Sequence, residues 1–240
     1  MPRFYLSQPL NSHTELTLPE NIVRHIYVLR LKIGDEITLF NGNGNEFTAT
    51  LQEINKRQAT CFVQEARYIN RESPLNITLV QAISSGERMD FTLQKGVELG
   101  VKTFLPIMSE RCVVKLSGER AEKRVARWQE IVIAACEQSG RNIVPKVLPI
   151  ITFKDYLKQI DKKNLHLIMS LNRAQKLRDF TPLPENIDLM IGPEGGWTTA
   201  EENAAFAVGV QSLTLGQRIL RTETASLAAV AAMQTLWGDF

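Results

Sequence analysis

Two glycine-rich loops carry the residues whose types and spacing could do chemistry. They occupy residues 191–196 and 215–225. Four charged residues stand in them among apolar side chains: Glu194, Arg218, Arg221 and Glu223. Glycine permits positive φ and lets backbone approach a flat or extended ligand closely. One such loop alone would equally well mark the end of a strand, but the pair with its inserted charges predicts a ligand site formed largely by backbone groups.

Each loop is predicted to join a strand to a helix. Residues 187–191 form an apolar run before the first loop, and Thr198-Thr199-Ala200-Glu201 after it is typical of a capping box. Residues 212–215 predict a short strand before the second loop, and the nearly uncharged run 222–237 predicts a buried helix. Ligands of open α/β sheets bind at the carboxyl ends of strands, so we expect one pocket formed by both loops.

The middle of the chain shows the same alternation of strands and helices. Apolar runs predict strands at 76–82, 103–108 and 165–170, and helical periodicity predicts helices at 88–99 and 119–138. Alternating β and α elements indicate an α/β domain with a mostly parallel sheet.

The first third of the chain is predicted to be rich in strands. Short strands are expected at 36–40, 46–51 and 59–64, with a helix at 21–30 whose Ile22, Ile26 and Leu29 share one face. The Asn- and Gly-rich residues 41–45 are typical of a hairpin turn, so their G-x-G pattern does not indicate a nucleotide loop. The polar stretch 67–74 is the best domain boundary, which we place after residue 72.

The two loops resemble the signature of SPOUT-class methyltransferases, and the chain is identified as a member of the ribosomal small subunit methyltransferase E family. The loop motifs are Gly192-Pro193-Glu194-Gly195-Gly196 and Leu215-Gly216-x-Arg218-x-Leu220-Arg221-x-Glu223-Thr224-Ala225. Four upstream blocks also match: Ser85-Gly86-Glu87-Arg88-Met89, Lys95-Gly96-Val97-Glu98-Leu99-Gly100, Ser109-Glu110-Arg111-Cys112 and Ala134-Ala135-Cys136-Glu137-Gln138-Ser139-Gly140-Arg141-Asn142.

The resemblance implies an activity and an architecture. It implies S-adenosylmethionine-dependent methylation of N3 of a uridine in 16S ribosomal RNA, within the small ribosomal subunit. Residues 1–72 would form a PUA-like β-barrel that binds RNA. Residues 73–240 would form the SPOUT domain, with a deep trefoil knot over about 165–240 and a homodimer interface.

The resemblance also carries over the cofactor residues. A third loop is expected at 168–171, where Met169-Ser170-Leu171-Asn172 departs from the histidine-proline pair of the class. The cofactor-binding residues are Met169, Ser170, Leu171, Ile191, Gly192, Pro193, Glu194, Gly195, Gly196, Leu215, Gly216, Arg218, Ile219, Leu220, Thr222, Thr224 and Ala225.

The reaction itself asks for few catalytic groups. A sulfonium already carries its leaving group, so the protein must chiefly align the nucleophile and exclude water. Uracil N3 becomes nucleophilic only as its proton leaves, which requires a proton acceptor or a cation beside the base. We expect Arg221 to stabilise the uracilate, and Glu223 or Glu194 to orient the base or accept the proton.

Charge gives a modest sign of RNA binding. Residues 102–146 hold nine basic and five acidic side chains, an excess that suits a phosphate-facing surface, although the basic run 120–127 fits a solvated helix face equally well. Residues 1–72 hold eight basic and eight acidic side chains, so RNA binding by this part would depend on where its basic residues lie and not on its net charge. The expected RNA-binding residues are Arg3, Arg24, Arg30, Arg88, Arg111 and Arg141.

Composition excludes several other classes. The chain has 240 residues, 44% hydrophobic and 22% charged, with a net charge of +2, as is ordinary for a globular protein. It shows neither an apolar signal region nor a membrane-length apolar run, so we expect a cytoplasmic protein. Three cysteines without a C-x-x-C pair, and His13, His25 and His166 far apart, predict core cysteines and no metal site.

Two other functions stay open from the sequence. A catalytically silent RNA-binding protein would explain the N-terminal domain and the basic helix, but not two ligand loops. A SPOUT ribose 2′-O-methyltransferase would keep both loops and differ in its product.

Overall fold

The chain divides into two compact units. We describe it from a computed structural model that covers residues 1–55, 57–181 and 185–240. Contacts group residues 1–72 with 136–144, and residues 73–135 with 145–240. Residues 136–144, expected in the second domain, group with the first unit in the structure.

The first unit is built on a mixed sheet of five described strands in the order β1-β3-β4-β5-β2. Only β1 and β3 are parallel, and the hairpin β3–β4 turns through the Asn- and Gly-rich residues as predicted. The strands are β1 Arg3–Tyr5, β2 Thr14–Leu18, β3 Glu36–Phe40, β4 Asn45–Ile54 and β5 Ala59–Tyr68. Neither β1 nor β2 was predicted.

Helix α1, Glu20–Val28, packs on this sheet through Ile22, Val23 and Ile26. The expected third member of its apolar face, Leu29, is the C-cap residue and is 51% exposed. Helix α1 ends at Val28, so Leu29 lies outside it and does not join the buried face. The third buried residue of the helix is Val23.

Polar contacts hold the segment 136–144 in the first unit. Arg141 and Glu72 form a bidentate pair in which both side chains are at least 90% buried. Glu46 accepts from Arg3 Nη1 at 2.8 Å and from Asn142 Nδ2 at 3.1 Å. Burial opposes ionisation of Glu46, but these hydrogen bonds outweigh it and lower its pKa.

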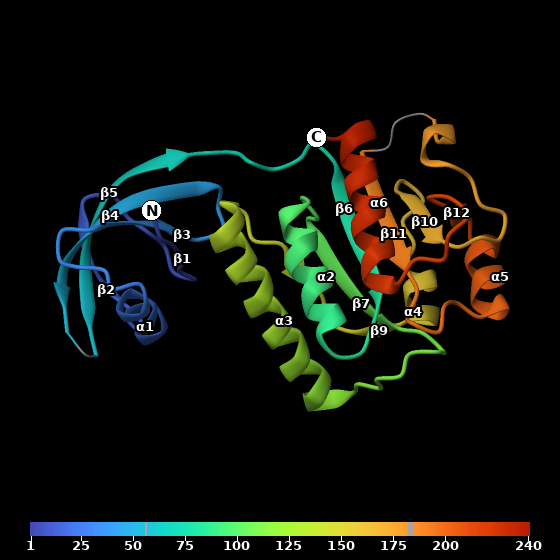
Figure 1. Cartoon of the computed structure of the whole chain (residues 1–240), viewed down its shortest axis with the longest axis horizontal. Coiled ribbons are helices and arrows are strands. Elements are labelled where there is room, and N and C mark those ends of the chain that lie inside the picture. Colours follow the sequence, from blue (N-terminus) through green and yellow to red (C-terminus); the bar gives the residue numbers. More distant parts are fainter. Residues whose placement is uncertain (56, 182–184) are drawn as a thin grey trace. The chain divides into compact units, whose positions relative to one another are not determined.

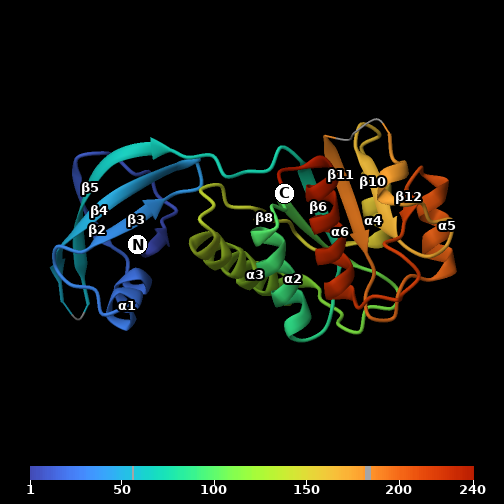
Figure 2. The ribbon, with the colours of Figure 1, turned by 45° about the horizontal axis from the view of Figure 1, so that its top comes forward.

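The second unit is an α/β domain on a parallel sheet, as expected. Its described strands run in the order β12-β10-β11-β6-β7-β8, and β9 also pairs with β7 (Figures 1 and 2). The strands are β6 Asn76–Ala82, β7 Thr103–Met108, β8 Lys146–Val147, β9 Ile151–Thr152, β10 Leu165–Met169, β11 Asn186–Ile191 and β12 Gln211–Leu213.

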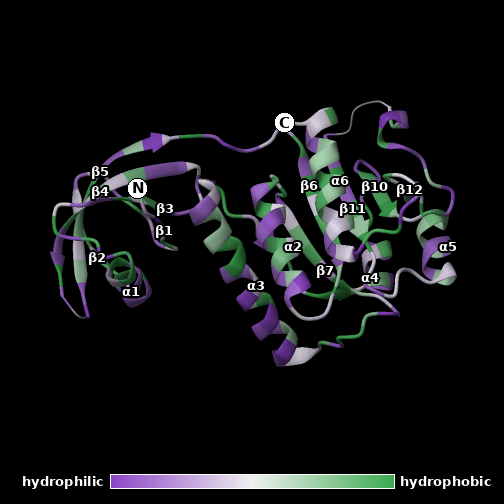
Figure 3. Cartoon of the chain, viewed as in Figure 1, coloured by the Kyte–Doolittle hydropathy of each residue, from purple (hydrophilic) through white to green (hydrophobic). Residues whose placement is uncertain are grey.

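Helices α2 and α6 lie side by side, and α6 packs on β6 and β11 (Figure 1). Helix α6, Thr222–Trp237, has the bounds that the sequence predicted, and its length is mostly apolar in Figure 3. The remaining helical segments are α2 Glu87–Glu98, α3 Gly118–Ser139, α4 Phe153–Lys158, the 3-10 turn η1 Leu177–Asp179 and α5 Thr199–Ala207. Helix α4 was not predicted.

A buried polar cluster lies where α4 meets the sheet. Tyr156 Oη lies 3.0 Å from His166 Nδ1, and Asp188 Oδ2 lies 3.2 Å from the same nitrogen. Burial opposes protonation of His166, but hydrogen bonds to Asp188 and to the Asp161 carbonyl outweigh it and raise its pKa. His166 is therefore a structural residue whose charged form the fold stabilises relative to a free histidine.

Cys61, Cys112 and Cys136 are buried free thiols, as the sequence indicated. Within the described part of the chain, no helix is both long and apolar enough to cross a membrane.

Candidate active site

A cavity of about 630 Å³ lies at the carboxyl ends of β10, β11 and β12. Its walls come from residues 169–171, 191–197, 213–215 and 218–223, with contributions from Arg88, Glu202 and Ala225. Its volume falls in the range of small-molecule sites. The structure thus gathers all the expected cofactor residues except Gly216 and Thr224, which do not line the cavity.

The glycines of the first loop serve different purposes. Among the loop's residues only Gly196 has positive φ, at 67°. A Cβ on Gly192 would lie 3.3 Å from the Trp197 indole, and one on Gly195 would lie 3.1 Å from Arg111 Cβ. Positive φ therefore explains glycine at Gly196 only, whereas a side chain at Gly192 or Gly195 would crowd Trp197 or Arg111.

One hydroxyl ties the two loops together. Thr222 Oγ1 donates to the Gly192 carbonyl at 2.7 Å and accepts from Gln81 Nε2 at 2.9 Å. Thr222 is 6% exposed and is the first residue of α6. Its hydroxyl is therefore occupied in joining the start of α6 to β6 and β11, and Thr222 shapes the cavity rather than offering its hydroxyl to a ligand.

The two acids of the glycine loops, Glu194 and Glu223, differ in their partners. Glu194 Oε1 accepts from Ser85 N and Ser85 Oγ, each at 2.8 Å, and from Arg88 Nη1 at 2.9 Å. Burial opposes ionisation of Glu194, but the Ser85 and Arg88 hydrogen bonds outweigh it and lower its pKa. Glu194 is thus a well-paired carboxylate that fixes the segment after β6.

Glu223 is less engaged. Its Oε1 lies 3.8 Å from Arg88 Nε, and its Oε2 is buried with no hydrogen-bond partner among the described residues. The carboxylate of Glu223 thus has fewer donors around it than that of Glu194. Arg88, which was expected to bind RNA, lines the cavity and lies near both Glu194 and Glu223.

The mouth of the cavity is cationic and apolar. Arg218 and Arg221 are exposed, and no described residue forms a hydrogen bond or ion pair with either guanidinium. Arg221 is also the N-cap of α6, whose N-terminus favours negative charge. Ile219 is 89% exposed and Leu171 is 59% exposed, which leaves apolar surface for a flat ring.

Four lining residues were missed by the sequence reasoning. Trp197 directly follows the first glycine loop, and its Nε1 has no partner within the described residues. Glu202 lies in the first turn of α5 and accepts from Ser170 Oγ. Leu213 is the last residue of β12, and Thr214 follows it before the second loop. In the sequence, Trp197 and Thr214 could have been recognised because they adjoin the two loop motifs. Glu202 and Leu213 carry no such signal.

The expected RNA-binding arginines have diverse surroundings. Arg24 and Arg30 are exposed, and Arg24 pairs with Glu20 on α1. Arg111 is exposed but donates to the Gly195 and Trp197 carbonyls at 2.9 and 3.2 Å, so it braces the first loop. Arg141 and Arg3 face inward to Glu72 and Glu46, as described above. The structure speaks against phosphate contacts by Arg141 and Arg3, because their side chains are only 5% and 14% exposed.

No group of three or more His, Cys, Asp or Glu side chains within residues 1–55, 57–181 and 185–240 is arranged to hold a metal ion.

Comparison with known proteins defines the class. Residues 71–234 match a family model described as an RNA methyltransferase domain, and residues 18–64 match one described as an RNA methyltransferase PUA domain. The parallel sheet with its glycine loops is thus an RNA methyltransferase domain, preceded by a PUA domain.

Full-length relatives narrow the class to one family. Ribosomal RNA small subunit methyltransferase E of Buchnera aphidicola (subsp. Acyrthosiphon pisum) is 34% identical over 100% of this chain and 95% of its own. The protein of that name from Bacillus subtilis is 32% identical over 97% and 96%. The chain belongs to the ribosomal RNA small subunit methyltransferase E family.

Solved structures agree with this assignment. The crystal structure of a ribosomal RNA small subunit methyltransferase E from Neisseria gonorrhoeae, bound to S-adenosylmethionine, has a TM-score of 0.96 and 59% identity, covering 100% of this chain and 99% of that one. A structure from Legionella pneumophila in complex with S-adenosylmethionine has a TM-score of 0.95 and 38% identity, covering 99% and 98%.

Proposed function

We propose that the protein transfers the methyl group of S-adenosylmethionine to N3 of a uridine in 16S ribosomal RNA of the small ribosomal subunit. One observation carries the proposal: the two glycine loops meet in one cavity, in a chain that is 59% identical to a methyltransferase E bound to S-adenosylmethionine.

The cavity fits this cofactor chemically. Leu215, Ile219 and Leu220 offer apolar surface for the flat faces of adenine, and the backbone of residues 191–196 lies open to an extended chain. Two lining groups lack partners in the described structure, the Trp197 Nε1 donor and the Glu223 Oε2 acceptor. When bound, S-adenosylmethionine supplies an electrophilic methyl on its sulfonium.

The residues of this chain prepare the base. Arg221, free at the mouth and at the N-terminus of α6, stabilises negative charge on the uracil oxygens as the N3 proton leaves. Glu223 accepts or orients that proton, because its Oε2 has no competing donor in the described structure. Glu194 is the poorer proton acceptor, since Ser85 and Arg88 already occupy its Oε1 and lower its pKa.

The remaining parts of the proposal concern assembly. The PUA-like unit, as a small barrel, docks ribosomal RNA through Arg24 and Arg30, which are exposed on and after α1. The second unit forms a trefoil knot and pairs with a second copy, which would cover Leu236 and Phe91, exposed on α6 and α2. We place the reaction in the cytoplasm, where small ribosomal subunits are made.

The test is mass spectrometry of nucleosides from 16S ribosomal RNA of a strain that lacks the protein and of its complemented parent. We expect 3-methyluridine to disappear in the deletion strain and to return on complementation. Loss of a 2′-O-methylated nucleoside instead would identify a ribose methyltransferase. No change in any nucleoside would indicate a silent RNA-binding protein.

A further inference from the structure

An exposed apolar patch lies at the end of α1 and in the loop that follows it. Four large apolar side chains are exposed there: Tyr27 by 45%, Val28 by 78%, Leu29 by 51% and Ile33 by 64%. Single exposed apolar residues are normal on a protein surface, whereas contiguous ones mark interaction sites. We call residues 27–33 the α1 patch.

Hydrogen bonds define the backbone of the α1 patch. Leu31 N donates to Ile26 O at 3.0 Å, and the Leu31 side chain packs against the core of the unit. Arg30 N donates to Tyr27 O at 3.1 Å, which completes the hydrogen-bond pattern of a Schellman cap. The exposed side chains are therefore presented by a defined turn and not by a fraying helix end.

Arg30 occupies the position of that cap where glycine is usual. Its φ is 56°, a left-handed conformation that is unfavourable for a residue with a Cβ. No described residue forms a hydrogen bond or ion pair with the Arg30 side chain, so no contact of this kind offsets the strain. Backbone strain at an exposed residue is a feature of functional sites. The Arg30 guanidinium is therefore available to a ligand.

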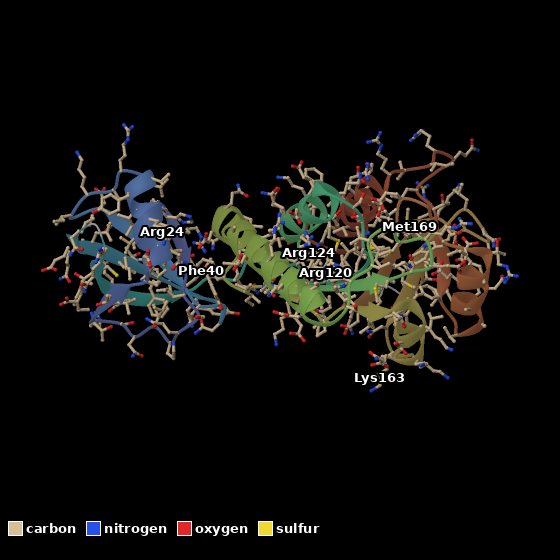
Figure 4. All side chains as sticks on the ribbon, turned by 90° about the horizontal axis from the view of Figure 1, so that it is seen from below. Arg24, Phe40, Arg120, Arg124, Lys163 and Met169 are labelled. Carbon is tan, nitrogen blue, oxygen red and sulfur yellow. The ribbon has the colours of Figure 1, made fainter. Side chains whose placement is uncertain are left out.

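The α1 patch carries positive charge. Lys32 is its other charged residue, and its side chain also forms no hydrogen bond or ion pair with any described residue. Arg24, which Figure 4 labels on α1, is exposed and lies one turn before Tyr27 and Val28. The acidic residues nearest in the sequence lie outside the patch: Glu20, Asp35 and Glu36. Phosphate groups suit such a surface.

The apolar side chains narrow the ligand to an unpaired nucleic acid strand. Phosphates pair with the cations but give nothing to Tyr27, Val28 and Ile33, and a duplex hides the faces of its bases inside the stack. The bases of an unpaired strand present flat faces that stack on aromatic side chains, while basic side chains hold the phosphates. Residues 18–64, which match the model of an RNA methyltransferase PUA domain, include the whole patch.

We infer that the α1 patch binds an unpaired segment of the RNA substrate, with one base stacked on Tyr27 and the phosphates held by Arg24, Arg30 and Lys32. The inference rests on the function proposed above, because it takes ribosomal RNA as the substrate. The stacked base distinguishes an unpaired strand from a duplex, which phosphate contacts alone do not.

The first test measures how the full chain binds a single-stranded oligouridylate and an RNA duplex of equal length over a range of salt concentrations. Tyr27→Ala should weaken binding of the single strand about fivefold to 150-fold, the effect of one lost base–aromatic stack. The slope of log affinity against log salt should not change, because Tyr27 carries no charge. Duplex binding should not change either. Tyr27→Phe keeps the ring and should keep the affinity.

Tyr68→Ala is the matched control. Tyr68 is 68% exposed and is the last residue of β5, and that end of β5 lies away from α1 in Figures 1 and 2. Its replacement should leave the affinity for the single strand unchanged. Urea unfolding verifies that both alanine variants are folded. Equal affinities of Tyr27→Ala and Tyr68→Ala for the single strand would overturn the inference.

The second test identifies the occupant of the α1 patch by cross-linking. Val28, which is outside the core, is replaced by a benzophenone-bearing amino acid, and the full chain is irradiated with small ribosomal subunits that lack the modification. We expect a cross-link to an unpaired segment of 16S ribosomal RNA. A cross-link only to a ribosomal protein, to a second copy of the chain or to paired RNA would overturn the inference.

The outcomes separate this inference from the proposed function. If Tyr27→Ala binds the single strand as the parent protein does, while the parent forms 3-methyluridine in 16S ribosomal RNA, the base contact is refuted and the proposed function stands. If Tyr27→Ala loses affinity as expected but the parent forms no 3-methyluridine, the α1 patch binds RNA and the proposed function fails.

Discussion

Thr222→Val is the sharpest perturbation of the site, because it removes a hydroxyl and almost nothing else. The Thr222 hydroxyl bridges the Gly192 carbonyl at 2.7 Å and the Gln81 side-chain amide at 2.9 Å. Valine has nearly the same shape but can make neither hydrogen bond. The change therefore tests whether a single tie between the two glycine loops maintains the cofactor cavity.

The magnitude follows from the two groups left behind. A buried polar group that loses its partner costs about 1–3 kcal/mol. Gln81 Nε2 is buried and keeps only its bond to the Ala82 carbonyl at 3.0 Å, and Gly192 O is partly buried. Because Thr222→Val leaves both of these groups without a partner, we expect it to lower the free energy of unfolding by about 2–4 kcal/mol. Cofactor affinity should fall at least about tenfold, because a loss of about 1.4 kcal/mol of binding free energy through disordering of the loops raises the Kd by a factor of ten.

The assays are urea unfolding and calorimetric titration with S-adenosylmethionine. Thr222→Ser is the matched control, since it keeps the hydroxyl and should retain most of both quantities. If Thr222→Val matched the parent protein in stability and affinity, or if Ser and Val behaved alike, the bridge would not maintain the site.

Other expectations concern separate parts of the molecule. Gly196→Val should abolish cofactor binding in calorimetry, since a β-branched residue is a steric outlier at φ 67°, and unchanged affinity would remove Gly196 from the site. His166→Asn should lower the free energy of unfolding most below about pH 6.5, because the raised pKa of His166 adds stability that is lost as pH rises through the folded-state pKa; a loss that grows with pH would show the wrong sign. Neutralising Arg24 and Arg30 should reduce the slope of log RNA affinity against log salt by about one unit each without altering cofactor affinity, and an unchanged slope would argue against docking there. Arg221→Ala should slow single-turnover methylation at saturating RNA by about 2–4 kcal/mol; a normal rate with weak RNA binding would assign it to docking.

The loops and their helices were predictable because their signals are local. The capping box at Thr198 and Glu201 and the bounds of α6 follow from residue types that are adjacent or one turn apart. The apolar runs behind β6, β7, β10 and β11 are long enough to be read as buried strands. Since both loops follow strands of one parallel sheet, their convergence was predictable as well.

The missed features depend on contacts between distant residues. Strand β1 has three residues, and β2 buries only Leu18, so neither produces a recognisable alternation. Arg141 was expected on the surface because the sequence gives no sign that Glu72 lies beside it. A side chain at position 195 would crowd Arg111, which is 84 positions away in the sequence. Only the folded chain reveals such pairs.

The central claim is tested most directly with purified protein, small ribosomal subunits that lack the modification, and S-adenosylmethionine labelled in its methyl group. Nucleosides from the 16S ribosomal RNA are then separated and identified by mass. We expect the label in 3-methyluridine, with Glu223→Gln binding the cofactor but transferring the methyl group much more slowly. Label in a ribose-methylated nucleoside, or no label in the RNA at all, would contradict the account.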